Sequence, residues 1–100
     1  MGASGDSSTL SARRVVVSGR VTGVAFRWHT RHKAGDYDDL RGWVRNLDRR
    51  TVECVVQGET WMVAEMVAWL RHGPPAARVT AIQVSVCPVD PSLASFRIDY

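Results

Sequence analysis

The sequence predicts an α+β fold in which an antiparallel sheet carries two helices on one face. Three observations predict it. Short runs of β-branched residues alternate with two segments of helical composition, two of the strand-like runs are separated only by a short turn, and the elements follow in the order β-α-β-β-α-β with a further short strand. This order is that of the split β-α-β arrangement, the ferredoxin-like sandwich. Many functions share that architecture, so the function has to be inferred from the residues of a site.

Each element of the first half has its own signal. The first strand rests on an apolar run of three valines, and the second is centred on Trp43-Val44. The first helix has a stripe of less polar residues at spacings of three and four, namely Phe26, Thr30, Ala34 and Tyr37. The expected elements are a strand over residues 13–18, a helix over 26–37, and strands over 40–46 and 51–57 joined by a turn at 47–50.

The second half contains the better-signalled helix. Thr60 is placed to cap its N-terminus, and Gly73 followed by Pro74-Pro75 ends it. The residues that recur at helical spacing between these signals include Met62, Met66 and Trp69. A strand with alternating apolar residues is expected over 78–87, and residues 96–100 form a short final strand.

Length and composition limit the class of protein. The chain has 100 residues, enough for one domain; residues 1–12 are small and polar and are expected to form a flexible tail, which leaves 13–100 for the folded domain. No apolar leader segment is evident and no run reaches membrane-spanning length, so a cytoplasmic protein is expected. The net charge of +3 suits an anionic partner. Cys54 and Cys87 lack the spacing of a zinc site or a redox pair.

The most informative segment is the turn between the first strand and the first helix. Gly19 and Gly23 lie in this turn, and such a turn lets backbone N–H groups converge on an anion. Arg27 follows in the first helical turn, where the positive end of the helix dipole disfavours a cation. An anion bound between the Arg27 guanidinium and the helix N-terminus removes this repulsion. Phosphate is the expected anion, because its oxygens match the planar, forked guanidinium of an arginine.

Two segments together resemble the signatures of the acylphosphatase family. The first is the loop with its arginine, Gly19-Arg20-Val21-Thr22-Gly23-Val24-Ala25-Phe26-Arg27, and the second is Gly42-Trp43-Val44-Arg45-Asn46. Weaker features follow at Gly73-Pro74, at Ala77-Arg78-Val79 and in the ending Phe96-Arg97-Ile98-Asp99-Tyr100. The resemblance covers residues 13–100 in order, and two independent signatures are far more specific than a lone glycine-rich turn.

The resemblance implies hydrolysis of the carboxyl–phosphate bond of acyl phosphates to a carboxylate and inorganic phosphate. Arg27 would bind the phosphoryl oxygens, and Asn46 would position the attacking water, because a carboxamide both accepts and donates hydrogen bonds. A carboxamide is no base at pH 7, so the substrate's own phosphate is the hypothesis for the general base. The other phosphate-binding residues implied are Arg20, which shapes or charges the loop, and the backbone of Val21, Thr22, Gly23, Val24, Ala25 and Phe26.

No metal and no organic cofactor are implied, because phosphoryl transfer needs mainly charge stabilisation and positioning. His29 and His32 share a helix face at a spacing that suits a metal, but no third ligand is evident, and we interpret them as a solvent-facing pair. The expected partner is a small-molecule acyl phosphate, with no nucleic acid and no membrane. A monomer is the default expectation.

Several positions depart from the family pattern. Thr22 stands where a glutamine is usual, while Ala25 and Asp39 stand where glycine is common; Asp tolerates a left-handed backbone better than most residues. Arg49-Arg50 occupies the hairpin position of a frequent Asp-Gly pair. An arginine forced to a positive φ there would cost about 1 kcal/mol or more. On that interpretation, Arg50→Gly is expected to stabilise the protein modestly.

The family's strand order also predicts the state of the cysteines. In the order 4-1-3-2 for the four main strands, the first strand lies between the strands that carry Cys54 and Cys87. Two strand spacings are about 9.5 Å, which is beyond the reach of a disulfide. Both thiols are therefore expected to stay unbridged.

Three alternatives remain open from the sequence. A non-catalytic module on the same fold would bind a phosphorylated ligand or metabolite without turning it over. The chain also resembles the N-terminal acylphosphatase-like domain of larger carbamoyl-transferring maturation enzymes, although it shows no zinc-finger motif or second domain. An RNA-binding domain is disfavoured, because the strands at 13–18 and 51–57 contain no aromatic residue.

Overall fold

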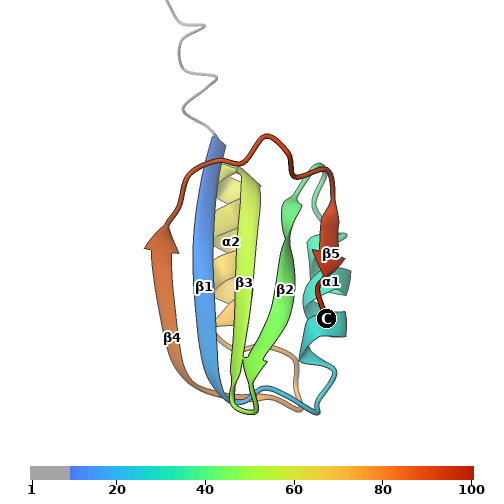
Figure 1. The fold of residues 1–100 in the computed structure, drawn as a ribbon, viewed down its shortest axis with the longest axis vertical. Helices are drawn as coiled ribbons and strands as arrows, with labels where there is room; N and C mark the ends of the chain where they lie inside the picture. Colours follow the sequence, from blue (N-terminus) through green and yellow to red (C-terminus); the bar gives the residue numbers. More distant parts are fainter. Residues whose placement is uncertain (1–9) are drawn as a thin grey trace, which may run out of the picture.

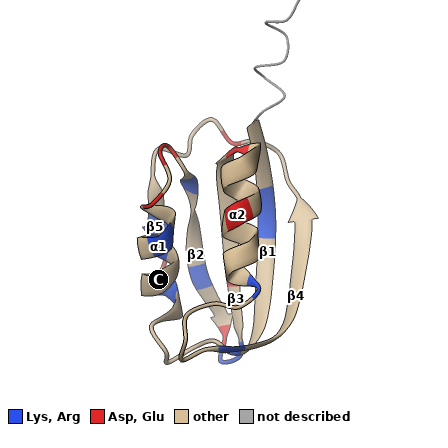
Figure 2. Cartoon of the chain, turned by 180° about the vertical axis from the view of Figure 1, so that it is seen from behind, with Lys and Arg blue, Asp and Glu red and all other residues tan. Residues whose placement is uncertain are grey.

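The computed structural model describes residues 10–100 and shows a two-layer α+β sandwich (Figure 1). The five-stranded sheet has the order β4-β1-β3-β2-β5, and both helices lie on one face of it (Figure 2). The elements are β1 (Leu10–Arg20), α1 (Phe26–Ala34), β2 (Arg41–Asp48), β3 (Thr51–Glu59), α2 (Thr60–Leu70), β4 (Arg78–Val86) and β5 (Phe96–Ile98). The predicted fold class and the order 4-1-3-2 with an added C-terminal strand are confirmed.

The sheet is antiparallel except at one edge. β1 pairs antiparallel with β3 and with β4, and β2 pairs antiparallel with β3. β5 instead runs parallel to β2, with Ile98 opposite Val44, so the sheet is antiparallel as predicted except for this one pair of strands. The chain crosses from β4 to the far edge before β5 begins (Figure 1). This crossing carries the C-terminal residues toward the same end of the sheet as Asn46.

β1 begins three residues before the predicted start at Arg13. Leu10 pairs with Glu59 of β3, and Ala12 is buried. Small polar residues carry little strand signal, so composition places residues 10–12 in the tail, whereas pairing with the long β3 extends the strand. Residues 1–9 lie outside the described part of the chain, so the flexible tail stays a prediction for them.

α1 ends at Ala34, three residues before the predicted end at Tyr37. Gly35 caps it, and the Gly35 N–H donates to the carbonyls of Arg31 and His32 at 3.2 and 3.1 Å. The turn that follows contains Asp39 at φ +62°, so the left-handed conformation expected there is confirmed. Of the predicted apolar stripe, the three helical members are buried, and Tyr37 packs against the core from the turn.

α2 matches its prediction at the C-terminus better than at the N-terminus. Thr60 is the first helical residue rather than the cap, which is Glu59, and the Thr60 hydroxyl lies 2.7 Å from that of Ser11. At the other end Gly73 has a φ of +69°, and its N–H donates to the Trp69 carbonyl at 2.8 Å. A Cβ on Gly73 would come within 2.6 Å of the Phe26 ring, so this glycine also lets the turn pack against the start of α1.

The core lies between the sheet and the two helices. Its largest fully buried side chains from the strands are Val15, Val17, Val44, Val52 and Val56, and those from the helices include Phe26, Met66 and Leu70. Phe26 matters most for function, because it is the first residue of α1 and lies 6.1 Å, ring to ring, from Trp69. Core packing therefore fixes the position of the helix N-terminus.

The opposite face of the sheet carries a buried carboxylate. Glu53 of β3 is only 5% exposed, and it accepts hydrogen bonds from Arg14 on β1 and from Arg45 on β2, the latter at 2.7 Å. Burial by itself raises the pKa of Glu53, but the hydrogen bonds and charges of the two arginines together lower it further, so the pKa lies below its usual range.

We expect Glu53→Gln to destabilise the protein by about 1–2 kcal/mol, because two arginines lose their buried partner. A carboxylate whose pKa is lowered by folding contributes stability above its unfolded pKa, about 4.3, and that contribution is lost as the pH falls through the folded pKa. Urea titrations at pH 7 and pH 3 should therefore show a smaller gap between wild type and variant at pH 3. Asp36→Asn, which removes the exposed partner of Lys33, is the control and should change little. An equal gap at both pH values would contradict the ion-pair explanation.

Cys54 and Cys87 are unbridged, as predicted. β1 lies between β3, which carries Cys54, and β4, which ends just before Cys87. Complete burial raises the pKa of the Cys54 thiol strongly, so Cys54 packs as a small apolar group in the core.

Candidate active site

The loop of residues 21–25 connects the end of β1 to the start of α1. Val21, the first residue of the loop, and Phe26, which follows its last residue, are both buried, so both ends of the loop are anchored in the core. Between them, Gly23 has a φ of +72° and Ala25 a φ of +57°. The N–H groups from Thr22 to Trp28 donate to no backbone carbonyl of residues 10–100. A helix start leaves such donors unsatisfied, and left-handed residues turn successive N–H groups to one side, so the loop can bind an anion.

Ala25 is the strained residue of this loop, since it holds an exposed left-handed conformation without being glycine. Ala25→Gly should raise the free energy of unfolding by about 0.5–1 kcal/mol, because the steric cost of the left-handed backbone disappears. Ala64→Gly, in the exposed middle of α2, is the matched control and should lower stability by about 1 kcal/mol. Urea titration measures both; a loss of stability in Ala25→Gly would mean that the methyl group contributes packing.

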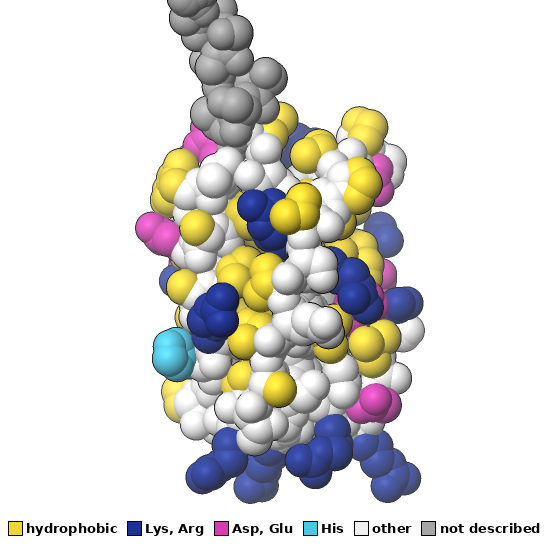
Figure 3. Space-filling view, turned by 90° about the vertical axis from the view of Figure 1, so that its left-hand side faces the viewer, with side chains coloured by type: hydrophobic (Ala, Val, Ile, Leu, Met, Phe, Trp, Pro, Cys, Tyr) yellow, Lys and Arg dark blue, Asp and Glu magenta, His cyan; other side chains and the backbone are white. Residues whose placement is uncertain are grey.

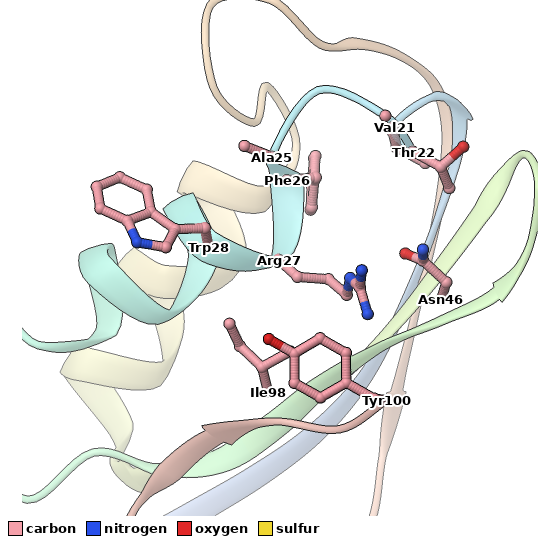
Figure 4. Close-up of a pocket in the computed structure, with 10 residues that line it drawn as sticks. Val21, Thr22, Ala25, Phe26, Arg27, Trp28, Asn46, Ile98 and Tyr100 are labelled. Atoms are coloured by element: carbon pink, nitrogen blue, oxygen red, sulfur yellow. The ribbon is translucent and has the colours of Figure 1, made fainter.

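Arg27 lies in the first turn of α1 and extends its guanidinium toward Asn46 (Figure 4). Within residues 10–100 it forms no ion pair and no hydrogen bond through its side chain, and the first turn contains no acidic residue. Its guanidinium carbon lies 4.9 Å from the centre of the Tyr100 ring. A cation without a counter-ion beside the positive end of a helix is unfavourable, and a bound phosphoryl group removes the repulsion.

Asn46 is held by β2, where it pairs with Val52 of β3 just before a β-bulge that separates it from Asp48. Bulges re-aim side chains, and this one ends the regular pairing of the hairpin. The exposed Asn46 side chain faces the Arg27 guanidinium (Figure 4) and makes no hydrogen bond within the described chain. Its oxygen and nitrogen are therefore both available to hold a water molecule.

The β2–β3 hairpin holds the loop in place through two hydrogen bonds. The Gly19 N–H donates to the Arg50 carbonyl at 2.9 Å, and the Thr22 hydroxyl donates to the Arg49 carbonyl. Neither arginine has a positive φ, and the Asp48 carboxylate accepts the Arg50 N–H at 2.8 Å. The expectation that Arg50→Gly relieves strain is therefore wrong, because this turn has another geometry and holds no strained arginine.

A pocket of about 200 Å³ lies over these residues. Its lining consists of Val21, Thr22, Gly23, Ala25, Phe26, Arg27, Trp28, Asn46, Ile98 and Tyr100 (Figure 4). The structure thus brings together Arg27, Asn46 and most of the predicted loop. Arg20, at the exposed end of β1, and Val24, which packs partly against the core, do not line the pocket.

Three lining residues, namely Trp28, Ile98 and Tyr100, are not among the site residues predicted from the sequence. Ile98 and Tyr100 reach the pocket because β5 runs parallel to β2. For Ile98 and Tyr100, the one indication in the sequence was that residues 96–100 resemble the C-terminal residues of the acylphosphatase family. The Thr22 hydroxyl donates to the hairpin, so its backbone N–H, the group assigned to the phosphate from the sequence, is what remains for a ligand.

Positive charge surrounds this end of the molecule. Figure 3 views the β4 edge and shows Lys and Arg side chains gathered at the end that holds the loop. Arg20 and Arg78 are register partners on β1 and β4, and Arg49 and Arg50 lie on the neighbouring hairpin. Such a field attracts anionic ligands, and added salt weakens it.

Within residues 10–100, no group of three or more His, Cys, Asp or Glu side chains is arranged to hold a metal ion. No helix in the same range is long and apolar enough to cross a membrane.

The fold is a small ferredoxin-like sandwich with a pocket whose chemistry suits an anion, and comparisons with known proteins identify its family. Residues 13–98 match the family model for acylphosphatase. The chain is 45% identical to an acylphosphatase from Rubrobacter xylanophilus over 85% of this chain and 76% of that one. The solved acylphosphatase of Coxiella burnetii superimposes with a TM-score of 0.85 at 35% identity, covering 93% of this chain and 96% of that one.

The same fold also occurs inside a larger protein. HypF of T. kodakarensis superimposes with a TM-score of 0.77 at 28% identity, but this chain covers only 12% of that structure.

Because of the family-model match and the identity to curated relatives, the protein belongs to the acylphosphatase family, which is a family of enzymes. Its likeness to the stand-alone acylphosphatases extends over most of both chains.

Proposed function

We propose that this protein hydrolyses acyl phosphates to a carboxylate and inorganic phosphate, with Arg27 and Asn46 as its catalytic residues. One observation supports this most strongly. Among residues 10–100 the Arg27 guanidinium has no counter-ion and the loop N–H groups have no backbone partners, while Arg27, the loop and the carboxamide of Asn46 line one pocket. The family assignment supplies the substrate class.

The loop and Arg27 bind the phosphoryl group in this mechanism. The N–H groups of the loop and the fork of Arg27 hold its non-bridging oxygens and neutralise their charge. Arg20, Arg49, Arg50 and Arg78 strengthen the positive field around the same end. The bound phosphorus is thereby exposed to attack from the side on which Asn46 lies.

Asn46 holds a water molecule through its carboxamide, with a lone pair directed at phosphorus. A bond forms between this water oxygen and phosphorus while the bond from phosphorus to the acyl oxygen breaks. The acyl group leaves as a carboxylate, which is stable without a proton, and a phosphate oxygen takes the proton of the water. Positioning and charge stabilisation account for most of such a reaction.

The test is hydrolysis of benzoyl phosphate by the wild-type protein in the presence of EDTA, followed by ultraviolet absorbance. We expect turnover that added Mg²⁺ does not increase. A phosphate monoester such as p-nitrophenyl phosphate is the matched control and should react far more slowly, because its phenolate leaving group is poorer than a carboxylate. A protein that binds phosphate by calorimetry but leaves benzoyl phosphate intact would instead be a non-catalytic phosphate-binding module.

The remaining proposals concern the setting of the enzyme. We propose a cytoplasmic location, since the fold needs no disulfide that would require an oxidising compartment. We also propose that the enzyme works as a monomer, because a single chain supplies the loop, Arg27 and Asn46, and that it needs no cofactor, because phosphoryl transfer relies mainly on positioning and charge stabilisation. The inner strands β1 and β3 carry no aromatic residue, which supports the absence of a nucleic-acid partner.

A further inference from the structure

We propose that the exposed indole of Trp28, together with Ile98, binds the acyl group of the substrate, so that the enzyme prefers acyl phosphates with an apolar or aromatic acyl group. This inference rests on the proposed hydrolysis and deepens it. It concerns the half of the pocket that the phosphate chemistry does not use.

The first step of the argument is the direction in which the acyl group must leave. In phosphoryl transfer the attacking and leaving oxygens lie roughly in line through phosphorus. Asn46 holds the water on one side of Arg27, and in Figure 4 Trp28 lies on the other side of the Arg27 main chain, with Ile98 below. All three residues line the same pocket. The leaving acyl group therefore extends from the phosphate site toward α1 and β5, away from Asn46.

The second step is the chemistry of the side chains at that end. Trp28 is 56% exposed, which leaves a large apolar surface in contact with water, and Ile98 is partly buried beside it in the lining. Neither residue places a charge or a hydrogen-bond acceptor against the acyl group. An apolar acyl group gains by covering such a surface, whereas a small acyl group covers little of it.

The third step is that the indole is already held in place. The ring of Trp28 stacks on that of His32, with centroids 5.0 Å apart and an interplanar angle of 9°, and meets the edge of His29 at 5.0 Å. A side chain fixed in this way loses little freedom when a ligand covers it. The two histidines thereby have a structural role in holding the indole.

A matched control exists in the same chain. Trp61 is 54% exposed and also lies on a helix, but its indole N–H donates to Glu59 and it lines no part of this pocket. Replacing either tryptophan removes a similar exposed surface. Only the replacement of Trp28 should alter substrate preference.

The experiment compares benzoyl phosphate with acetyl phosphate in the wild type, Trp28→Ala and Trp61→Ala. We expect Trp28→Ala to raise KM for benzoyl phosphate roughly 5- to 10-fold with little change in kcat, and to change KM for acetyl phosphate less than about twofold. Trp61→Ala should match the wild type on both substrates. An equal change on both substrates in Trp28→Ala, or no change on either, would overturn the acyl-binding role.

A binding measurement separates this inference from the proposed activity. Benzoylphosphonate and acetylphosphonate replace the scissile linkage by a P–C bond, so calorimetry on them needs no turnover. We expect the wild type to bind the benzoyl compound more tightly and Trp28→Ala to lose that preference. Selective binding without hydrolysis of either phosphate would overturn the activity alone, and hydrolysis without selective binding would overturn this inference alone.

Discussion

Arg27→Ala is expected to lower kcat/KM for benzoyl phosphate by about 1,000-fold or more. Among residues 10–100 the guanidinium is the only side-chain cation that lines the pocket, and it would meet two phosphoryl oxygens through its planar fork. Removing it leaves the backbone N–H groups to hold the phosphate alone. Steady-state kinetics at matched ionic strength measure the effect.

Arg27→Lys is the informative companion variant. A lysine keeps the charge but loses the fork, so we expect activity between those of Arg27→Ala and the wild type. The fold should survive in both, because Arg27 forms no ion pair within residues 10–100 and opposes the dipole of α1. Circular dichroism and urea titration check this. Wild-type turnover in a folded Arg27→Ala protein would exclude Arg27 from the mechanism.

Asn46→Ala should lower kcat by about 100-fold and leave inhibition by inorganic phosphate nearly unchanged, because Asn46 acts on the water rather than on the phosphate. Its side chain makes no hydrogen bond within the described chain, so little stability should be lost. The combination of a low kcat with intact phosphate binding is the signature of a water-positioning residue.

Asn46→Asp gives the contrasting result. A carboxylate would repel the phosphoryl group, so we expect KM and the phosphate inhibition constant to rise together with the fall in kcat. An Asn46→Ala protein with undiminished kcat, or one whose phosphate binding falls as far as its kcat, would contradict the assigned role.

The part of the site that could be predicted from the sequence consists of residues that lie close together along the chain. The glycines of the loop, Arg27 at the start of a helix and Asn46 at the end of a strand all lie in two short segments, and the structure brings these segments to one pocket. The same holds for the buried face of α1. The helical spacing of its less polar residues, which predicts that face, can be recognised within a few neighbouring positions of the sequence.

What could not be predicted depends on long-range pairing. Ile98 and Tyr100 reach the pocket only because β5 pairs in parallel with β2, and nothing in a strand of three residues specifies its neighbour. Shifts in the pairing register between strands could not be predicted from the sequence either. The register between β1 and β4 shifts after Ser18, so that Val79 and Ile82 both pack against the core although three positions separate them.

The hairpin shows how a family comparison can mislead on geometry. A frequent Asp-Gly pair at the position of Arg49-Arg50 suggests a turn with positive φ, yet Asp48 accepts the Arg50 N–H and the turn avoids that conformation. Ala25 shows the opposite case. There the left-handed backbone is kept without glycine, because the buried residues at both ends of the loop hold it in place.

Hydrolysis of benzoyl phosphate in ¹⁸O-labelled water tests the central claim most directly, namely that a water held by Asn46 attacks phosphorus. The mechanism predicts that the label appears in inorganic phosphate and that benzoate stays unlabelled, as mass spectrometry of the two products would show. Label in benzoate would mean that water attacks the carbonyl carbon instead, and the roles assigned to Arg27 and Asn46 would then be wrong.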